Sequence, residues 1–379
     1  MLLDATERDP AVHPERQLFD NIYNKRWDAR RTDLREPAMT DPAHVPPAQH
    51  AVAPAAAGAA AAPATAPADP WPTRVPRAAV TTFVLVACAL AWLVALPLWT
   101  GDGLASPLFP VLAVLVMWTP AAAVLVVTLV QKVPARDRLR ALGVRPLRPL
   151  RRTLGLTALG LVAPVVLVAA VTLLAGALGL VRLDLTGFSG FAEQVEGTLP
   201  AGAELPPVGV LVAAQLVAIP FGALVNSLAA LGEEVGWRGW LLPALLPLGT
   251  WPALVVSGAV WGLWHAPLIL LGYNFGRPDV VGVLLMVGGC VAWGVLLGWL
   301  RLRSGSLWPP VVAHGALNAV AGLVAVLVAA GETPDMAVVG PLGLVAWGVL
   351  AVVAVVLVAT GQLARRPAGG TVRTTAPTR

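Results

Sequence analysis

Apolar segments long enough to cross a membrane recur along most of this chain, and they constrain its fold more than any other feature. A helix needs about 20 consecutive apolar residues to span the hydrocarbon core of a bilayer. Backbone N–H and C=O groups exposed to lipid must hydrogen-bond within the protein, and a continuous apolar segment of this length achieves this by forming a helix. We therefore expect an all-α, polytopic membrane protein of about eight transmembrane helices. The eight segments cover 78–99, 107–131, 154–180, 208–232, 251–271, 280–300, 308–330 and 338–361.

Composition agrees with a membrane protein and excludes two other classes. The chain is 57% hydrophobic and only 12% charged, which is too little polar surface for a soluble protein of this length. The net charge of +5 does not indicate nucleic-acid binding, because most basic residues outside the N-terminal region flank apolar segments. The lipid bilayer is the expected partner, and no nucleic acid is expected.

The sequence divides into three parts. Residues 1–73 combine a charged stretch with an Ala/Pro-rich one, a composition typical of a disordered tail. Residues 74–364 hold the apolar segments, and 365–379 form a short C-terminal tail that we also expect to be disordered. Cys88 and Cys290 both lie inside apolar segments, and the sequence alone does not establish whether they form a disulfide.

Charges between the segments predict the orientation in the membrane. Basic residues accumulate in cytoplasmic loops, and loop 132–153 carries eight of them against one acid, Asp137. Basic pairs also precede the first segment and follow the sixth and eighth. The alternate loops are acidic or sparse in charge. We therefore predict that both termini lie in the cytoplasm.

Few ionisable residues occur inside the segments or at their ends, so those few are informative. A carboxylate at membrane depth costs roughly 2.5–3.5 kcal/mol and persists mainly where a site needs it. Glu234 and Arg238 are four residues apart, the favoured spacing for an ion pair on a helix. Glu233 is rotated by about 100° from Glu234. We expect Glu234 and Arg238 to brace a site in which Glu233 is the candidate base.

Two histidines lie in later segments. His265 comes four residues after Trp261 and shortly before Pro267, where a kink would widen a cavity. His314 and Asn318 are also four apart and share a helix face. A carboxylate and a histidine can activate water, and a histidine and an amide can stabilise an oxyanion.

Each of these residues also has a structural interpretation. An intramembrane histidine is often only a hydrogen-bonding residue, and a Glu–Arg pair at a helix end is often only a brace. Their occurrence together in three separate segments favours a catalytic site. A proton-coupled transporter is a third hypothesis, but the sequence shows no repeat between its halves.

The ordered set EExxxR (Glu233, Glu234, Arg238), aromatic-xxx-His (Trp261, His265) and HxxxN (His314, Asn318) resembles the CPBP family of intramembrane endopeptidases. This family, also called ABI, contains CAAX prenyl proteases and bacteriocin-processing proteins. The motifs span 233–318, and the segment layout is similar over about 208–330, which we take as the motif core. Trp261 stands where the family usually has Phe. The tail 1–73 lies outside the resemblance.

The resemblance implies roles for these residues. Residues 74–364 would be an eight-helix protease domain, with Glu233 and His265 activating water. His314 and Asn318 would stabilise the oxyanion, and Glu234, Arg238 and Trp261 would support the site. An alternative makes Glu233, His265 and His314 zinc ligands, hence a metalloprotease. The chain lacks the HExxH spacing, so we favour direct activation of water and assign no cofactor.

The resulting hypothesis is an endopeptidase that cleaves a peptide or membrane protein near the cytoplasmic membrane face. The alternative is a non-catalytic immunity or scaffold protein of the same fold, such as one for bacteriocin self-immunity. Only two of the 26 basic residues are lysine, which indicates a GC-rich bacterial genome and a place in the bacterial cytoplasmic membrane. The prenylated tails cleaved by eukaryotic relatives are therefore not the expected substrate. The sequence does not indicate an oligomeric state.

Overall fold

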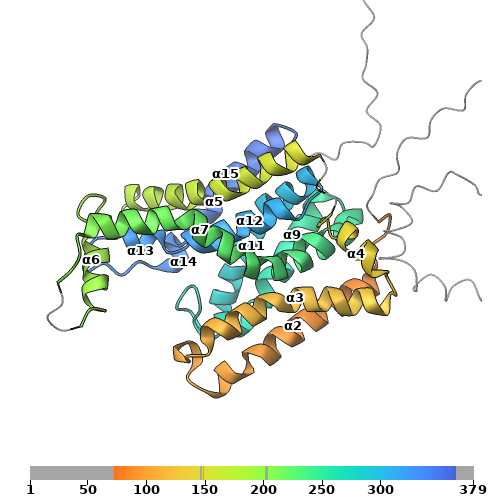
Figure 1. The fold of residues 1–379 in the computed structure, drawn as a ribbon, viewed down its shortest axis with the longest axis horizontal. Coiled ribbons are helices and arrows are strands. Elements are labelled where there is room, and N and C mark those ends of the chain that lie inside the picture. Colours follow the sequence, from red (N-terminus) through yellow and green to blue (C-terminus); the bar gives the residue numbers. More distant parts are fainter. Residues whose placement is uncertain (1–71, 146, 148, 201–203, 364–379) are drawn as a thin grey trace, which may run out of the picture.

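The computed structural model describes residues 72–145, 147, 149–200 and 204–363 (Figure 1). Within these ranges the fold is all-helical, and extended chain pairs only at an isolated antiparallel bridge between Leu183 and Val328. The predicted disordered tails at 1–73 and 365–379 lie outside the described residues, except for residues 72 and 73. The expectation of an all-α fold is confirmed.

Seven helical segments of the described chain are long and apolar enough to cross a membrane. They follow the predicted segments closely, because each predicted segment is a continuous apolar run. These seven are α2 (Arg77–Thr100), α3 (Phe109–Val130), α5 (Leu150–Ala177), α7 (Val208–Glu234) continuing through η2 (Val235–Leu241), α8 (Leu242–Leu245) and η3 (Leu246–Leu248), α11 (Val280–Ser304), α12 (Trp308–Val320) with α13 (Leu323–Leu327), and α14 (Met336–Val339) with α15 (Leu344–Ala359).

The predicted segment at 251–271 differs from the others. It forms α9 (Thr250–Trp264) of 15 residues and a short α10 (Ala266–Ile269), with His265 at the break. At 1.5 Å per residue α9 is about 22 Å long, less than the roughly 30 Å of a hydrocarbon core. Pro267 at the start of α10 has no N–H to continue the helical ladder. The fifth predicted segment is therefore a broken helix, and the described residues contain seven further helices long enough to span a membrane.

The short elements lie at the two ends of the long helices. They are η1 (Gly103–Ala105), α4 (Ala135–Ala141) and α6 (Ser189–Glu196). In Figure 1 the start of α2, α4 and the C-terminal end of α15 lie at one end of the molecule, and α6 lies at the opposite end. The end of α11 joins the first group, because the Arg301 guanidinium lies against Gly143 in the loop after α4.

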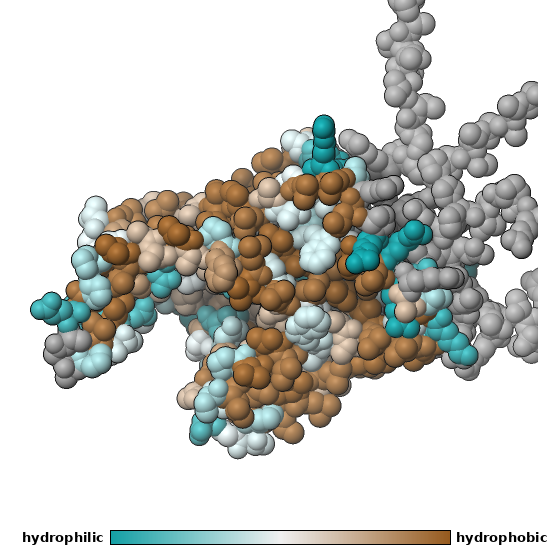
Figure 2. Space-filling model, in the orientation of Figure 1, coloured by the Kyte–Doolittle hydropathy of each residue, from teal (hydrophilic) through white to brown (hydrophobic). Residues whose placement is uncertain are grey.

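We name these two ends by their charges. The arginine-rich end contains α4 and loop 132–153. The acidic end contains the loops 101–108, 178–207, 270–279 and 328–335. The acidic residues of these loops are Asp102, Asp184, Glu193, Glu196, Glu204, Asp279, Glu332 and Asp335. Between the two ends the surface is mainly hydrophobic (Figure 2), as a lipid-facing surface requires.

Small residues let the helices approach closely around the site. Gly315 of α12 faces α7, where an added Cβ would collide with the Ala223 carbonyl oxygen. Gly258 of α9 faces α11, with its Cβ position 2.7 Å from Val291 Cα. Close contacts of this kind are the usual means of helix association in lipid, where apolar surface alone gives no driving force. They fix α7, α9, α11 and α12, the helices that carry most of the site.

Candidate functional site

Glu233 lies at the C-terminal end of α7 and is only 2% exposed. Its Oε2 accepts hydrogen bonds from two indole N–H groups, Trp261 Nε1 at 2.5 Å and Trp237 Nε1 at 3.3 Å. Hydrogen bonds to a charged group are stronger than those between neutral groups, so these two indoles offset part of the cost of burying the carboxylate. Glu233 also lines a cavity, and Oε1 is left as the oxygen that can bind water there.

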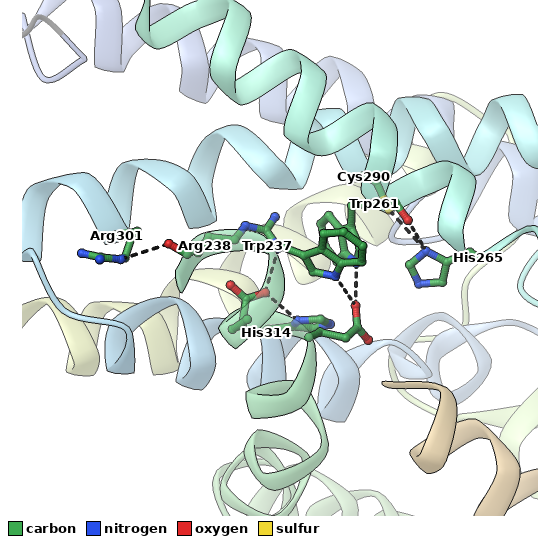
Figure 3. Close-up of polar contacts among 9 residues, drawn as sticks. Trp237, Arg238, Trp261, His265, Cys290, Arg301 and His314 are labelled. Carbon is green, nitrogen blue, oxygen red and sulfur yellow. Dashed lines mark hydrogen bonds and ion pairs between the residues drawn. The ribbon is translucent and has the colours of Figure 1, made fainter. Parts of the chain in front are cut away.

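Glu234 faces another direction, as its rotation from Glu233 predicts. Its Oε1 lies 2.8 Å from Arg238 Nη1, and both side chains are buried. The Arg238 guanidinium also lies 4.1 Å from the centroid of the Trp261 ring, within range of a cation–π interaction. The predicted ion pair is thus present. The backbone carbonyl of Arg238 is also hydrogen-bonded, because Arg301 Nε donates to Arg238 O at 3.1 Å (Figure 3).

His314 is tied to the same carboxylate, a contact that the sequence analysis did not foresee. Its Nδ1 lies 2.9 Å from Glu234 Oε1. A carboxylate oxygen accepts, so Nδ1 carries the proton and donates. This bond fixes the ring of His314 and leaves Nε2 free for other contacts. Glu234 therefore orients His314 as well as binding Arg238.

His265 occupies the break between α9 and α10. Its Nδ1 lies 2.8 Å from the Trp261 carbonyl oxygen, which can only accept, so this nitrogen also carries a proton. In the neutral ring Nε2 is then the nitrogen able to accept a proton. The Trp264 ring packs edge-on against His265 with centroids 4.6 Å apart, and Cys290 Sγ lies 3.9 Å from Nδ1. These contacts fix the orientation of His265.

Trp261 contacts more of the site than any other predicted residue. Its indole N–H binds Glu233, its carbonyl oxygen binds His265, and its ring faces Arg238. The edge of its ring system also packs against His314, with centroids 5.3 Å apart. One tryptophan therefore sets the relative positions of residues from α7, α9, η2 and α12. Figure 3 shows Trp261 between Arg238, His265 and His314.

A cavity of about 420 Å³ brings the predicted residues together. Glu233, His265, His314 and Asn318 all line it. Its other walls are largely apolar, a combination typical of sites that bind a small or extended ligand. The volume suits a few side chains of a polypeptide rather than a folded domain.

Several cavity residues escaped the sequence analysis. Asn226 lies on α7 about two helical turns before Glu233, and Tyr273 and Asn274 lie in the loop after α10. Asn226 is a polar residue in an apolar run, a signal that could have identified it. Tyr273 and Asn274 follow the predicted segment, and only the fold brings them to the cavity.

The zinc alternative requires three donors around one point. Within the described part of the chain, no group of three or more His, Cys, Asp and Glu side chains is close enough to hold a metal ion. Nδ1 of His265 and Nδ1 of His314 each donate to an oxygen acceptor, which leaves Nε2 of each ring as the nitrogen that a metal would use.

Comparisons with known proteins match the same region. A family model described as type II CAAX prenyl endopeptidase Rce1-like matches residues 215–320. CAAX prenyl protease 2 from Methanococcus maripaludis is 24% identical over 149 residues, covering 32% of this chain and 54% of that protein. The chain therefore matches about half the length of this curated relative. The region that the family model matches carries Glu233, His265, His314 and Asn318, and both matches support the resemblance of this region to the CPBP family.

Proposed function

We propose that this protein is an intramembrane endopeptidase in which Glu233 and His265 activate water for attack on a peptide bond. The observation that carries the proposal is the cavity lined by Glu233, His265, His314 and Asn318. The family match of residues 215–320 supports it. The bacterial cytoplasmic membrane is the proposed location.

The geometry supports separate roles for the two sides of the site. Two indole N–H groups hold Glu233 Oε2, so Oε1 can orient a water in the cavity and accept its proton. His265 Nε2 is the second base, since Nδ1 is committed to the Trp261 carbonyl oxygen. Hydroxide then adds to the carbonyl carbon of the substrate, and the abstracted proton is returned to the departing amine.

The oxyanion formed in this step needs donors on the opposite side. Asn318 carries an amide N–H₂, and it lies one helical turn after His314 on the cavity wall. Glu234 holds His314 Nδ1, which directs its Nε2 away from that carboxylate. With Nδ1 donating to Glu234, His314 can also donate from Nε2 only as the doubly protonated imidazolium, and this donor and the Asn318 amide would stabilise the negative oxygen. Loss of one such donor typically costs 10²–10³-fold in kcat.

The test uses purified full-length protein in detergent and a panel of membrane-derived peptides. Glu233→Gln should lower the rate of cleavage by about 10²–10⁴-fold, the usual contribution of a general base. Glu196→Gln removes a carboxylate from the exposed helix α6 and is the matched control. Equal cleavage by Glu233→Gln and by the unchanged protein would refute the assignment.

A second arm separates direct water activation from zinc chemistry. Metal content of the purified protein is measured, and cleavage is compared before and after chelation. We expect activity to survive chelation. Stoichiometric zinc together with chelator-sensitive cleavage would replace our mechanism with the metal-dependent one and leave the peptidase assignment intact.

A further inference from the structure

The cavity has a direction, which its lining residues reveal. Helices α3, α9, α11 and α12 contribute residues from the part nearer the acidic end, whereas α7 contributes Asn226, Ala229 and Glu233 from its C-terminal part. Trp261, Trp264 and His265 close the C-terminal end of α9, and Ala113 lies in the first turn or two of α3. Met286 and Cys290 belong to the first half of α11, which begins at the acidic end.

The remaining lining residues lie in the acidic-end loops themselves. Asn274 and Tyr273 belong to loop 270–279, and Met336 opens α14 after loop 328–335. Both Asn274 and Met336 are partly exposed, whereas Glu233 is buried at the end of α7 that approaches the arginine-rich end. The cavity therefore runs from Glu233 toward the acidic end. Figure 2 shows a recess between the α2–α3 pair and the other helices, on the side away from α4.

Fixed contacts frame this opening. Phe109 at the start of α3 packs against Tyr273 with ring centroids 5.4 Å apart. Arg277 Nη2 lies 2.7 Å from Asp335 Oδ2, which joins loop 270–279 to the start of α14. The rim thus consists of α3, loop 270–279 and α14.

Charge assigns the two ends to the two sides of the membrane. Loop 132–153 has eight basic residues and one acid, a strong cytoplasmic signal. The acidic end has two arginines in its described loops, and each is paired with an acid. Arg182 Nε lies 2.6 Å from Glu332 Oε2, and Arg277 pairs with Asp335. These arginines therefore add no net basic signal at that end.

We propose that the site admits its substrate from the non-cytoplasmic side of the membrane, through the opening formed by α3, loop 270–279 and α14. The inference rests on the proposed peptidase function. The fitting substrate is an extended, apolar polypeptide segment that reaches the outer face of the membrane, such as the juxtamembrane part of an exported protein. This replaces the expectation of cleavage near the cytoplasmic face, which followed only from the position of Glu233 at the end of its helix.

The test labels single cysteines in the full-length protein with a membrane-impermeant maleimide. Cys88 and Cys290 are replaced by alanine so that only the introduced thiol reacts. Asn274→Cys probes the opening, Thr198→Cys marks the exposed acidic end, and Arg140→Cys marks the exposed arginine-rich end. In spheroplasts Asn274→Cys and Thr198→Cys should react, whereas Arg140→Cys should react only in inside-out vesicles.

Two outcomes would overturn the proposal. Reaction of Asn274→Cys only in inside-out vesicles would place the opening on the cytoplasmic side, and reaction in neither preparation would show that no opening exists there. Neither result bears on peptide cleavage, which is measured in detergent where both faces are accessible. In that assay a bulky maleimide on Asn274→Cys should slow cleavage at least tenfold, while the same label on Thr198→Cys should leave the rate unchanged.

Discussion

Replacing Arg238 by methionine isolates the role of the buried ion pair. Glu234 is fully buried, and both of its hydrogen bonds, from Arg238 and His314, fall on Oε1. Its Oε2 has no hydrogen-bond partner among the described residues. Arg238→Met therefore leaves a buried carboxylate with His314 as its remaining partner, which typically costs about 3–5 kcal/mol. At a few degrees per kcal/mol, the melting midpoint should fall by on the order of 10 °C.

A double-mutant cycle tests this reasoning. Glu234→Gln removes the charge but keeps a carbonyl oxygen that can accept from His314 Nδ1. The double variant Glu234→Gln/Arg238→Met should therefore cost less than the sum of the single variants, by on the order of 2 kcal/mol. Unfolding is followed by tryptophan fluorescence in detergent. The exposed pair of Arg182 and Glu332 is the control, and Arg182→Met should cost under about 1 kcal/mol. Costs that add within about 0.5 kcal/mol would refute the coupling.

Three further predictions concern packing, the central tryptophan and an acidic-end loop. Gly315→Ala should push α12 away from α7, which should lower the free energy of unfolding by about 1–3 kcal/mol and slow cleavage. Gly222→Ala is the control, because its Cβ meets only ordinary contacts in the same interface, and it should change neither the stability nor the cleavage rate. Thermal melting and the cleavage assay measure these two quantities. Trp261→Phe removes one hydrogen bond to Glu233 but keeps the ring, so kcat should fall about tenfold, and Trp261→Ala should lower it further; equal rates for the two variants would contradict this role. Asp184 accepts four hydrogen bonds from backbone and hydroxyl donors of residues 186–189, and these bonds hold its pKa well below the usual range. The carboxylate therefore stabilises this loop fully above pH about 3.9. That stabilisation is lost only as the pH falls through the lowered pKa. Amide exchange should show protected N–H groups at Thr186, Gly187 and Ser189 down to pH 4, and the protection should be absent in Asp184→Ala, which has no side-chain acceptor.

The sequence predicts most of the fold because the hydropathy of each segment is a local property. Seven predicted segments correspond to full-length helices, and the segment at 251–271 was expected to kink near Pro267. Its division into two short helices falls at His265, two residues before Pro267, and this local backbone feature is not recorded in the hydropathy pattern. The orientation of the termini stays a prediction.

The site was predicted in part for a similar reason. Helical spacing alone identifies the ion pair of Glu234 with Arg238 and the shared face of His314 and Asn318. The contact between His314 and Glu234 joins residues 80 positions apart, and the two indoles on Glu233 come from different helical segments. Such contacts follow from the packing of α7, α9 and α12, so they require the folded structure. The catalytic roles of these residues stay predictions.

The segment η2 is a π-helical turn, so the geometry of the site depends on the number of residues in this segment. A π turn holds an extra residue compared with an α turn and is often found at functional sites. Deleting one residue from Val235–Leu241 would return the segment to α geometry and rotate the following helix by about 100°. The buried Leu242 and Leu245 would then leave their packing positions, although no side chain of the cavity had been substituted. Homologous proteins that share this site should therefore vary freely in their loop lengths but keep a constant number of residues between the paired glutamates and α8.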